Sequence, residues 1–554
     1  MTEDAKSRNE CRGAALRRKS MAAAIEITFA LTLSNTALAA NFVTNLNDAG
    51  PGSLRQAVAN ANGSGLFPAI VQFQTGLTGT ITLTTGEIPI TQSVNVDGPG
   101  ADAITVSAGG TSRIFNALYT GSLPVTISGL TLQNGYSATT GGAVYVSAPT
   151  FAMNNCVIQN SVADTQGAGL YVVNNASTTL SGDTFSNNQG PIGCGFLVIS
   201  SQATITGIVS ENNICSTRGG GGETQGTATI TASQFLNNSG GGLYARGVGS
   251  VYIANSTVIG NSSTGYGGGI GASKVSGVTI VGSAISGNYS AKSGGGLAVL
   301  AAQGNTSIVH STFDNNRTRI VGGVKSASSG GGISVRNNSN TTAVAIQSST
   351  ISNNQAGNGA GIFMSSMGVL NVSMYDTTIA SNTAQYSFGG AVIEPPVGDG
   401  SVLTVESTTI ASNSAHSIGG IDASRLVSKF HDSIVANNIL ITNGTLDPDI
   451  HGAITANFSL FGDAGDAVIT GTGNLIGVDP MLGSLGDYGG GIATMLPLSG
   501  SPVINAGDPA FDPEASPALD ERGLPRVVGS AIDIGAVEVQ AVEDTIFLNG
   551  FESG

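Results

Sequence analysis

Acidic side chains that could act as catalytic acids or bases are sparse in the middle of this sequence. Glycoside hydrolysis needs two carboxylates about 5–10 Å apart. After residue 300 in the repeat region, the candidates are Asp314, Asp376, Glu394, Asp399, Glu406, Asp422 and Asp432. Asp314 and Asp376 lie two and six residues before the asparagine that ends their repeats, so they do not share a position in the repeat. No Asp-Asp pair, Gly-His-Gly or Arg-x-Lys motif occurs in this region. We therefore predict no catalytic residues.

The histidines do not supply the missing base. His310 and His431 each lie six residues before the asparagine that ends a repeat, four repeats apart. If each repeat is one coil, that separation is about 19 Å at ~4.8 Å per coil, which is too far for the two to act together. His416 and His451 are isolated, and a lone exposed histidine is usually a solvated surface residue.

Metal and cofactor sites have little support in the sequence. Asp447 with Asp449, and Asp463 with Asp466, are spaced for weak calcium binding, but the glycine and glutamate of an EF-hand loop are missing. Solvated loop acids explain both pairs better. No Cys/His spacing typical of zinc is present. We expect no cofactor and leave weak calcium binding open.

Three cysteines remain if an N-terminal signal containing Cys11 is removed: Cys156, Cys194 and Cys215. An odd number excludes a complete disulfide framework. Cys194 and Cys215 lie about one repeat apart, so a disulfide and two small buried thiols are both open.

The elements that must position these residues are repeats of about 27 to 28 residues. Many repeats open on glycines, as in GGAVYV (141–146) and GGGLAV (294–299), and close on an asparagine. The twelve closing asparagines are Asn134, Asn160, Asn188, Asn212, Asn238, Asn261, Asn288, Asn316, Asn354, Asn382, Asn413 and Asn437. A fixed period of this length indicates stacked supersecondary units.

Within a repeat, the apolar residues are spaced as in strands. Val278 and Ile280 lie two positions apart and Ile285 follows after a polar pair, and four other repeats have the same pattern. Residues two apart point to one face of a strand, and an asparagine suits a corner that requires positive φ. The predicted fold class is all-β, a right-handed parallel β-helix with at least ten coils between residues 116 and 440.

One internal column can be predicted from this register. Ile285, Ile351, Ile379 and Ile410 occupy the same position in their repeats and are expected to stack inside the helix. A neighbouring strand residue points to the opposite face. Thr350 is therefore expected to face solvent, and Thr350→Asp to be nearly silent.

Residues 1–39 are predicted to be a secretory signal peptide. Arg17 to Lys19 are charged, residues 21–38 are mostly apolar, and Ala37-Leu38-Ala39 is a small-residue cleavage site. An N-terminal helix or membrane anchor is the alternative. No other segment is apolar enough to cross a bilayer.

Residues 40–115 are expected to form an N-terminal cap and the first coils. Ser53 and Gln56 form a capping box, and a helix from Leu54 would present one apolar face and end at Asn62-Gly63. A single amphipathic helix before a solenoid is most simply a plug over its open end, because an end coil exposes core and unpaired backbone.

The C-terminal part differs in composition. Residues 441–554 hold 16 Asp and Glu against two Lys and Arg, whereas residues 40–440 hold 15 against 12. We divide this part into an acidic, loop-rich segment (441–543) that closes the helix and a short tail (544–554). Its acids are expected to lie away from the long faces. The acidic balance argues against nucleic acid as a partner.

The glycine and asparagine halves are similar to the repeats of polymorphic outer-membrane proteins and to pectin-lyase-like β-helices. The run DAGPGSLRQAV (48–58) resembles the opening of bacterial secreted β-helix proteins of the choice-of-anchor type. Their C-terminal signature is matched by DPMLG (479–483), GSPVINAG (500–507), DERGLPR (520–526) and DIGAVE (533–538). The tail resembles a short ending of proteobacterial exported proteins. The resemblance covers roughly residues 41–538 and implies a surface or secreted protein.

These observations favour a non-catalytic β-helix protein that is secreted or displayed at the cell surface, in the Gram-negative outer membrane or outside the cell. Adhesion, surface presentation or an envelope structural role would suit it. The expected partners are an extracellular polysaccharide or a host or cell-surface ligand, and the expected state is a monomer. The alternative is a carbohydrate-active enzyme, a polysaccharide lyase or glycoside hydrolase, because many β-helices have such activity.

Overall fold

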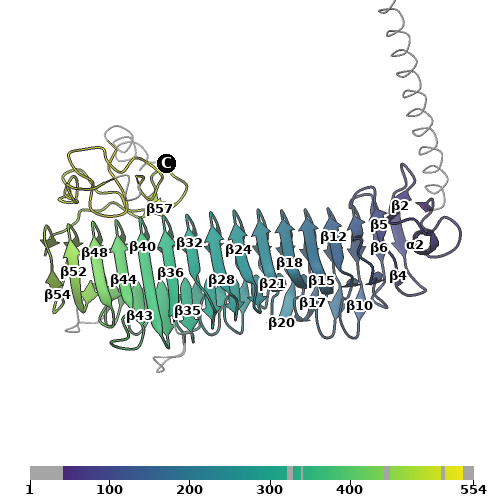
Figure 1. Cartoon of the computed structure of the whole chain (residues 1–554), viewed down its shortest axis with the longest axis horizontal. Coiled ribbons are helices and arrows are strands. Elements are labelled where there is room, and N and C mark those ends of the chain that lie inside the picture. The colour runs from purple at the N-terminus through teal and green to yellow at the C-terminus, as the bar shows by residue number, and fades with distance from the viewer. Residues whose placement is uncertain (1–40, 321–327, 339–340, 442–448, 513–517, 541–554) are drawn as a thin grey trace, which may run out of the picture.

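The chain forms an elongated right-handed parallel β-helix in the computed structural model (Figure 1). The structure describes residues 41–320, 328–338, 341–441, 449–512 and 518–540. The predicted signal peptide and the short C-terminal tail lie outside the described residues. The fold class inferred from the repeats is confirmed.

Each coil contributes one strand to a sixteen-stranded parallel sheet, called sheet B here. Twelve of its strands, β9 to β49, lie between residues 116 and 440, which confirms the expectation of at least ten coils. The strands are β3 (Gly79–Thr82), β6 (Ile104–Ser107), β9 (Thr131–Gln133), β13 (Val157–Gln159), β16 (Thr184–Ser186), β19 (Val209–Glu211), β22 (Gln234–Leu236), β25 (Thr257–Ile259), β29 (Ala284–Ser286), β33 (Thr312–Asp314), β37 (Thr350–Ser352), β41 (Thr378–Ala380), β45 (Thr409–Ala411), β49 (Ile434–Ala436), β53 (Leu460–Phe461) and β55 (Leu475–Ile476).

The other faces of the coils are formed by a 28-stranded sheet, sheet A, and by shorter strands, sheet C. Most coils give sheet A two strands in succession, as β11 (Val144–Ser147) and β12 (Thr150–Asn154) do. Sheet C is split into a four-stranded and a seven-stranded part, and the latter includes β30 (Tyr289–Ser290) and β34 (Arg317–Thr318). Three long strands span both positions in sheet A: β15 (Leu170–Ser181), β18 (Phe196–Thr206) and β21 (Gly222–Thr231).

The predicted internal column is present in sheet B. Ile285, Ile351, Ile379 and Ile410 align across neighbouring strands, with Phe313 between the first two. All five side chains are fully buried. Such columns, stacked over sixteen coils, make one continuous apolar core that a single coil could not form.

The corner asparagines differ from the expectation in the middle of the helix. In many coils the residue before the closing asparagine takes the positive φ, as Asn187 does at 55°, and Asn188 itself is buried. Buried asparagines then form a ladder of stacked amides. Its members are Asn188, Asn213, Asn238, Asn261, Asn288, Asn316, Asn354, Asn382, Asn413 and Asn438.

Each amide in the ladder satisfies backbone and side chain at once. The Oδ1 of Asn288 accepts from both the backbone N–H and the Nδ2 of Asn261, each at 3.0 Å, and Asn288 Nδ2 donates to the carbonyl of Val258 at 2.9 Å. Buried polar groups are tolerated when all their hydrogen bonds are made. Two of the predicted asparagines, Asn212 and Asn437, are corner residues directly before the true ladder members.

The predicted N-terminal helix is α2 (Leu54–Gly63). Ser53 caps it and accepts from the backbone N–H of Gln56 at 3.2 Å. The helix buries one apolar face against the first coils and lies at the N-terminal end of the β-helix (Figure 1). The Ser53 cap and the position of the helix agree with the expectation from sequence, but only half of the predicted capping box is formed. Gln56 Nε2 donates to Asn60 Oδ1, and the backbone N–H of Ser53 donates to the carbonyl of Gly50 instead.

The C-terminal part does not lie where we expected. Strands β51 (Ile450–His451) to β55 continue the helix, and residues 479–512 and 518–540 then fold back along its side (Figure 1). In these described residues the chain forms loops and one short hairpin, β56 (Gly486–Asp487) and β57 (Ala493–Thr494). We call residues 479–512 and 518–540 the flank segment. It packs on the outer face of sheet B over β37, β41 and β45. Its acids therefore lie against a long face rather than away from it.

The flank segment also overturns the prediction for Thr350. Thr350 points outward, as expected, but it is fully buried because the flank segment covers it. Its hydroxyl donates to the carbonyl of Ala493 and lies 3.4 Å from Glu521 Oε1. Strand periodicity determines which way a side chain points, but not what a later part of the chain places over it.

Candidate functional site

A groove with a volume of about 420 Å³ lies where the flank segment meets the helix. It is lined by Val309, His310, Gln347, Ser348, Asp376, Ala518, Leu519, Asp520, Glu521 and Gly523. A pocket that gathers titratable groups is the default place to look for chemistry. Of the residues singled out in the sequence, the structure brings His310 and Asp376 to this groove.

The two residues come from equivalent corners after strands of sheet A. His310 and Asp376 both have positive φ, 46° and 45°. Sheet pairing aligns His431 with Glu406 and, through the intervening strands, with Val309. The predicted match between His310 and His431 is therefore wrong by one residue, because Asn437 is a corner residue and the buried ladder residue of that coil is Asn438.

Asp376 is held by a cation from the flank segment. Arg526 Nη2 forms an ion pair with Asp376 Oδ1, and the two side chains are only 1% and 2% exposed. Burial raises the pKa of Asp376 to about 6, although Arg526 opposes the rise. Arg526 Nη1 also donates to the carbonyl of Gly535 at 2.7 Å. This pair joins positions 150 residues apart and fastens the flank segment to the helix.

Glu521 is the second carboxylate at the contact, and it is fully buried. Its Oε1 accepts from the backbone N–H of Thr378 at 3.0 Å, and its Oε2 bonds to the hydroxyls of Thr378 and Thr494. Burial raises the pKa of Glu521 to about 8. At neutral pH the carboxyl is mostly protonated and both of its oxygens are engaged in packing the segment.

A separate network holds the flank segment together internally. Arg522 Nη2 pairs with Asp520 Oδ2 at 2.9 Å, with both side chains fully buried, and donates to the carbonyl of Glu538. Glu538 Oε2 accepts from the backbone N–H of Asp533 at 2.7 Å, and burial raises its pKa to about 8. The DERGLPR and DIGAVE runs that carried the family resemblance thus supply the residues that fold and dock this segment.

A hydrolase or lyase centre needs an acid, a base and a charge stabiliser around one reacting atom. Among the described residues at the groove, both carboxylates already have protein partners. Asp376 is occupied by Arg526 and Glu521 by three threonines. His310 is exposed at the rim, and the structure gives it no carboxylate partner among the described residues.

The remaining acids of the sequence analysis have structural contacts. Asp314 Oδ1 accepts from Ser352 Oγ at 2.8 Å and Asn353 Nδ2 at 2.7 Å. His431 lies 3.0 Å from Asp432 and 3.2 Å from Asp508, and the hydrogen bond to Asp432 raises its pKa.

Further pairs are spread along the helix rather than gathered at one point. His451 lies 3.1 Å from Asp422. Asp399 accepts from the backbone of Ser401 at 2.9 Å. Glu394 and Glu406 are partly exposed on strands of sheet A, and His416 is exposed.

One acid of the proposed calcium pairs has a structural role. Asp449 is buried at the end of the asparagine ladder, where its Oδ1 accepts from the backbone and side chain of Asn438 at 2.9 and 2.8 Å. Asp463 and Asp466 are exposed, and Asp447 lies outside the described residues. Within the described ranges no group of three or more His, Cys, Asp or Glu is placed to hold a metal ion.

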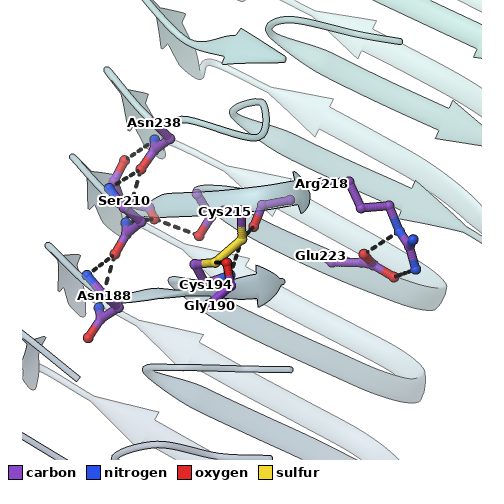
Figure 2. The surroundings of a disulfide bond; sticks show 11 residues. Asn188, Gly190, Cys194, Ser210, Cys215, Arg218, Glu223 and Asn238 are labelled. Atoms are coloured by element: carbon purple, nitrogen blue, oxygen red, sulfur yellow. Dashed lines mark hydrogen bonds and ion pairs between the residues drawn. A yellow bond between two sulfur atoms is a disulfide. The ribbon is translucent and has the colours of Figure 1, made fainter. Parts of the chain in front are cut away.

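The cysteine pairing left open by the sequence is a disulfide between Cys194 and Cys215, with Cα atoms 5.7 Å apart (Figure 2). It ties β20 (Ile214–Arg218) of sheet C to the residue two before β18 in the preceding coil. Cys156 is free and buried, and burial raises its pKa to about 12.

Sequence reasoning missed a buried ion cluster beside the disulfide. Glu223 is fully buried and pairs with Arg218 at 2.9 Å and with Arg246 at 2.6 Å. Figure 2 shows the Arg218–Glu223 pair on one side of the disulfide and the ladder residues Asn188 and Asn238 on the other. The signal available was one glutamate between two arginines in a stretch otherwise poor in charge.

A comparison with family models supports the fold. A family model described as "Right handed beta helix region" matches residues 220–394. The crystal structure of pectate lyase Pel9A resembles the chain with a TM-score of 0.31 and 14% identity, covering 90% of this chain and 96% of that one. No curated protein matches the sequence. Across the described residues, no helix has the length and apolarity needed to span a membrane.

Proposed function

We propose that this chain is an exported, non-catalytic β-helix protein that acts by presenting its long faces at the cell surface or outside the cell. The observation that carries the proposal is the state of the buried carboxylates. At the groove, Asp376 forms an ion pair with Arg526 and Glu521 forms hydrogen bonds with Thr378, and both contacts join the flank segment to the helix. Adhesion and an envelope structural role are the activities that such a rod suits.

A screen for turnover tests the non-catalytic part. The purified chain is incubated with uronic-acid and neutral polysaccharides, with calcium present, and products are read as unsaturated sugars by ultraviolet absorbance and as reducing ends. We expect no product above a boiled control. Turnover that survives purification and disappears on one substitution of an Asp, Glu or His in the repeats would contradict the proposal.

Export is tested separately at the N-terminus. The predicted cleavage after Ala39 or Ala40 gives a mature chain whose first peptide is identified by mass spectrometry of the extracellular and membrane fractions. A native N-terminus at Met1 or Met21 in those fractions would contradict export through a signal peptide. Light scattering of the same sample checks the expected monomer.

A carbohydrate-active enzyme is the second candidate, and the groove is the observation that favours it. His310 and Asp376 both line it, and Asp376 Oδ2 has no hydrogen-bond partner among the described residues. Asp376→Asn and His310→Ala separate the two functions. Loss of turnover in both variants with the fold retained would favour the enzyme.

A further inference from the structure

The central coils have a net positive charge, although the net charge of the whole chain is negative. Residues 218–336 hold eight Lys and Arg against two Asp and Glu, a net charge of +6, in a chain whose net charge is −15. One of the two acids, Glu223, is already paired with two arginines. Lys292 and Arg317 are exposed and form no ion pair with another described residue. The middle of the rod is therefore a cationic band between acidic ends.

Four of these cations stack on an aromatic ring from a neighbouring coil. Each side-chain cation lies near the ring centroid, at a distance typical of a cation–π contact. The contacts are Arg218 over Tyr244 at 5.4 Å, Lys292 over Tyr266 at 4.9 Å, Arg317 over Tyr289 at 5.8 Å and Arg336 over Phe363 at 4.8 Å. We call these eight residues the basic–aromatic band. The stacking holds long, flexible side chains in place, which lowers the entropy cost of binding a ligand.

The band is continuous across coils. The ring of Tyr244 covers Gly271, where an added Cβ would lie 2.6 Å from a ring carbon and 3.3 Å from the carbonyl of Tyr266. Arg336 Nη2 reaches back to Ser293 Oγ at 3.3 Å, next to Lys292. These contacts link three of the stacks along the helix axis, with adjacent strands ~4.8 Å apart. The fourth, Arg317 over Tyr289, lies on the paired strands β30 and β34 of sheet C, and Tyr289 precedes Lys292 by three residues.

We propose that the basic–aromatic band binds an anionic polysaccharide, a chain of sugar rings carrying carboxylate or sulfate groups. Exposed ammonium and guanidinium groups pair with such anions, and Arg does so through two parallel hydrogen bonds. Tyrosine presents an apolar face with a polar edge, which suits a sugar ring. Cations repeated on successive coils engage a polymer at several points, so weak contacts add to a useful affinity. The proposal rests on the exported, non-catalytic function proposed above.

A single-stranded nucleic acid is the competing polyanion, since aromatic rings and arginines also bind it. The chain's acidic ends disfavour it, because a nucleic acid carries a denser line of charge than a glycan with one anion per one or two sugars. Single-stranded DNA is therefore a comparison ligand in the test.

The test uses the mature full-length chain and immobilised alginate, dextran sulfate, neutral dextran and single-stranded DNA. Binding is measured at low and at high salt for three proteins: the wild type, Lys292→Gln/Arg317→Gln in the band, and Arg425→Gln/Lys429→Gln as a control. The control removes the same charge from exposed residues outside the band. Thermal unfolding confirms that all three are folded.

We expect binding to alginate or dextran sulfate, none to dextran, and a loss of affinity of about tenfold in the band variant from two lost ionic contacts. The control variant should stay within about twofold, and high salt should weaken binding. Equal losses in the two variants, tighter binding to DNA, or no binding to either anionic glycan would overturn the proposal. The fate of the glycan separates this result from the proposed function. Cleavage of a bound glycan would refute the non-catalytic function and leave the band standing, whereas absence of both binding and cleavage would refute the band alone.

Discussion

Two flanks of the same rod are built from the same repeat and end in opposite states. On the outer face of sheet B, Thr350, Thr378 and Thr409 lie under the flank segment and are almost completely buried. On the other side, the basic–aromatic band leaves Lys292 and Arg317 exposed. The small hydroxyl side chains allow the flank segment to pack closely, and they form hydrogen bonds with its buried Glu521. The long cationic side chains of the band stack on aromatic rings and remain exposed to solvent. The difference lies in outward residues that contribute nothing to the core.

The largest loss of folding stability is expected for substitutions in strand β37, where Ile351 lies in the core column and Thr350 lies under the flank segment. Ile351→Asp places a charge in a fully buried apolar column and should lower the free energy of unfolding by several kcal/mol. Thr350→Asp should also be strongly destabilising, because this residue faces the buried Glu521. Denaturant unfolding of both variants checks this, with Thr279→Asp on the outer face of β28 (Gly277–Val281), partly exposed, as the comparison. A silent Thr350→Asp would show that the flank segment does not cover this face.

The next largest effect is expected for a substitution that weakens the docking of the flank segment but leaves the core of the β-helix intact. Arg526→Met leaves Asp376 buried without its cation and should cost about 3–5 kcal/mol. The flank segment should then be cleaved early in limited proteolysis while the repeats resist. Arg425→Met, an exposed arginine, is the control. Equal protection of the segment in both variants would contradict the role given to the Asp376–Arg526 pair.

A smaller loss of stability is expected when the disulfide, which lies away from the flank segment, is removed. The Cys194–Cys215 bond closes a loop of 21 residues, and its loss in Cys194→Ala/Cys215→Ala should cost up to about 3 kcal/mol. Stacking on both neighbouring coils restrains this loop even when it is reduced, so the measured loss should be at the low end. Unfolding with and without reductant, for the wild type and the variant, measures it. If reductant does not change the unfolding free energy of the wild type, the predicted contribution of the disulfide is contradicted.

The last effect is a pH dependence to which the covered flank contributes. Burial raises the pKa of Glu521 from 4.5 to about 8, so the folded state binds this proton more tightly than the unfolded state does. Stability from this group is complete below about pH 4.5 and is lost as the pH rises through about 8. The unfolding midpoint should therefore fall between pH 5 and pH 8.5. Glu521→Gln, which mimics the protonated form, should flatten that fall, and an unchanged slope would contradict the assignment.

The fold was predictable because its causes are local and repeated. Alternating apolar residues identified the column through Ile285 and Ile410, and a capping box identified the helix from Leu54. The ladder was harder to predict, because in tandem asparagines such as Asn437-Asn438 either residue fits the corner by composition. Only stacking against the next coil decides which one is buried.

The candidate site could not be predicted from the sequence, for a different reason. The contact of Asp376 with Arg526 and that of Thr350 with Glu521 join residues 150 and 171 positions apart. No periodicity links a repeat to a segment that folds back on it. The acidic composition of residues 441–554 did indicate a separate segment, but composition carries no information about which face that segment would cover.

We propose that the carboxylates at the groove hold the flank segment and do not catalyse a reaction. The most direct measurement is polysaccharide turnover and unfolding by the wild type and Glu521→Gln in parallel, across pH 5 to 8.5. We expect no product from either protein and a flatter pH dependence of unfolding in the variant. Turnover by the wild type that disappears in an equally stable Glu521→Gln would contradict it.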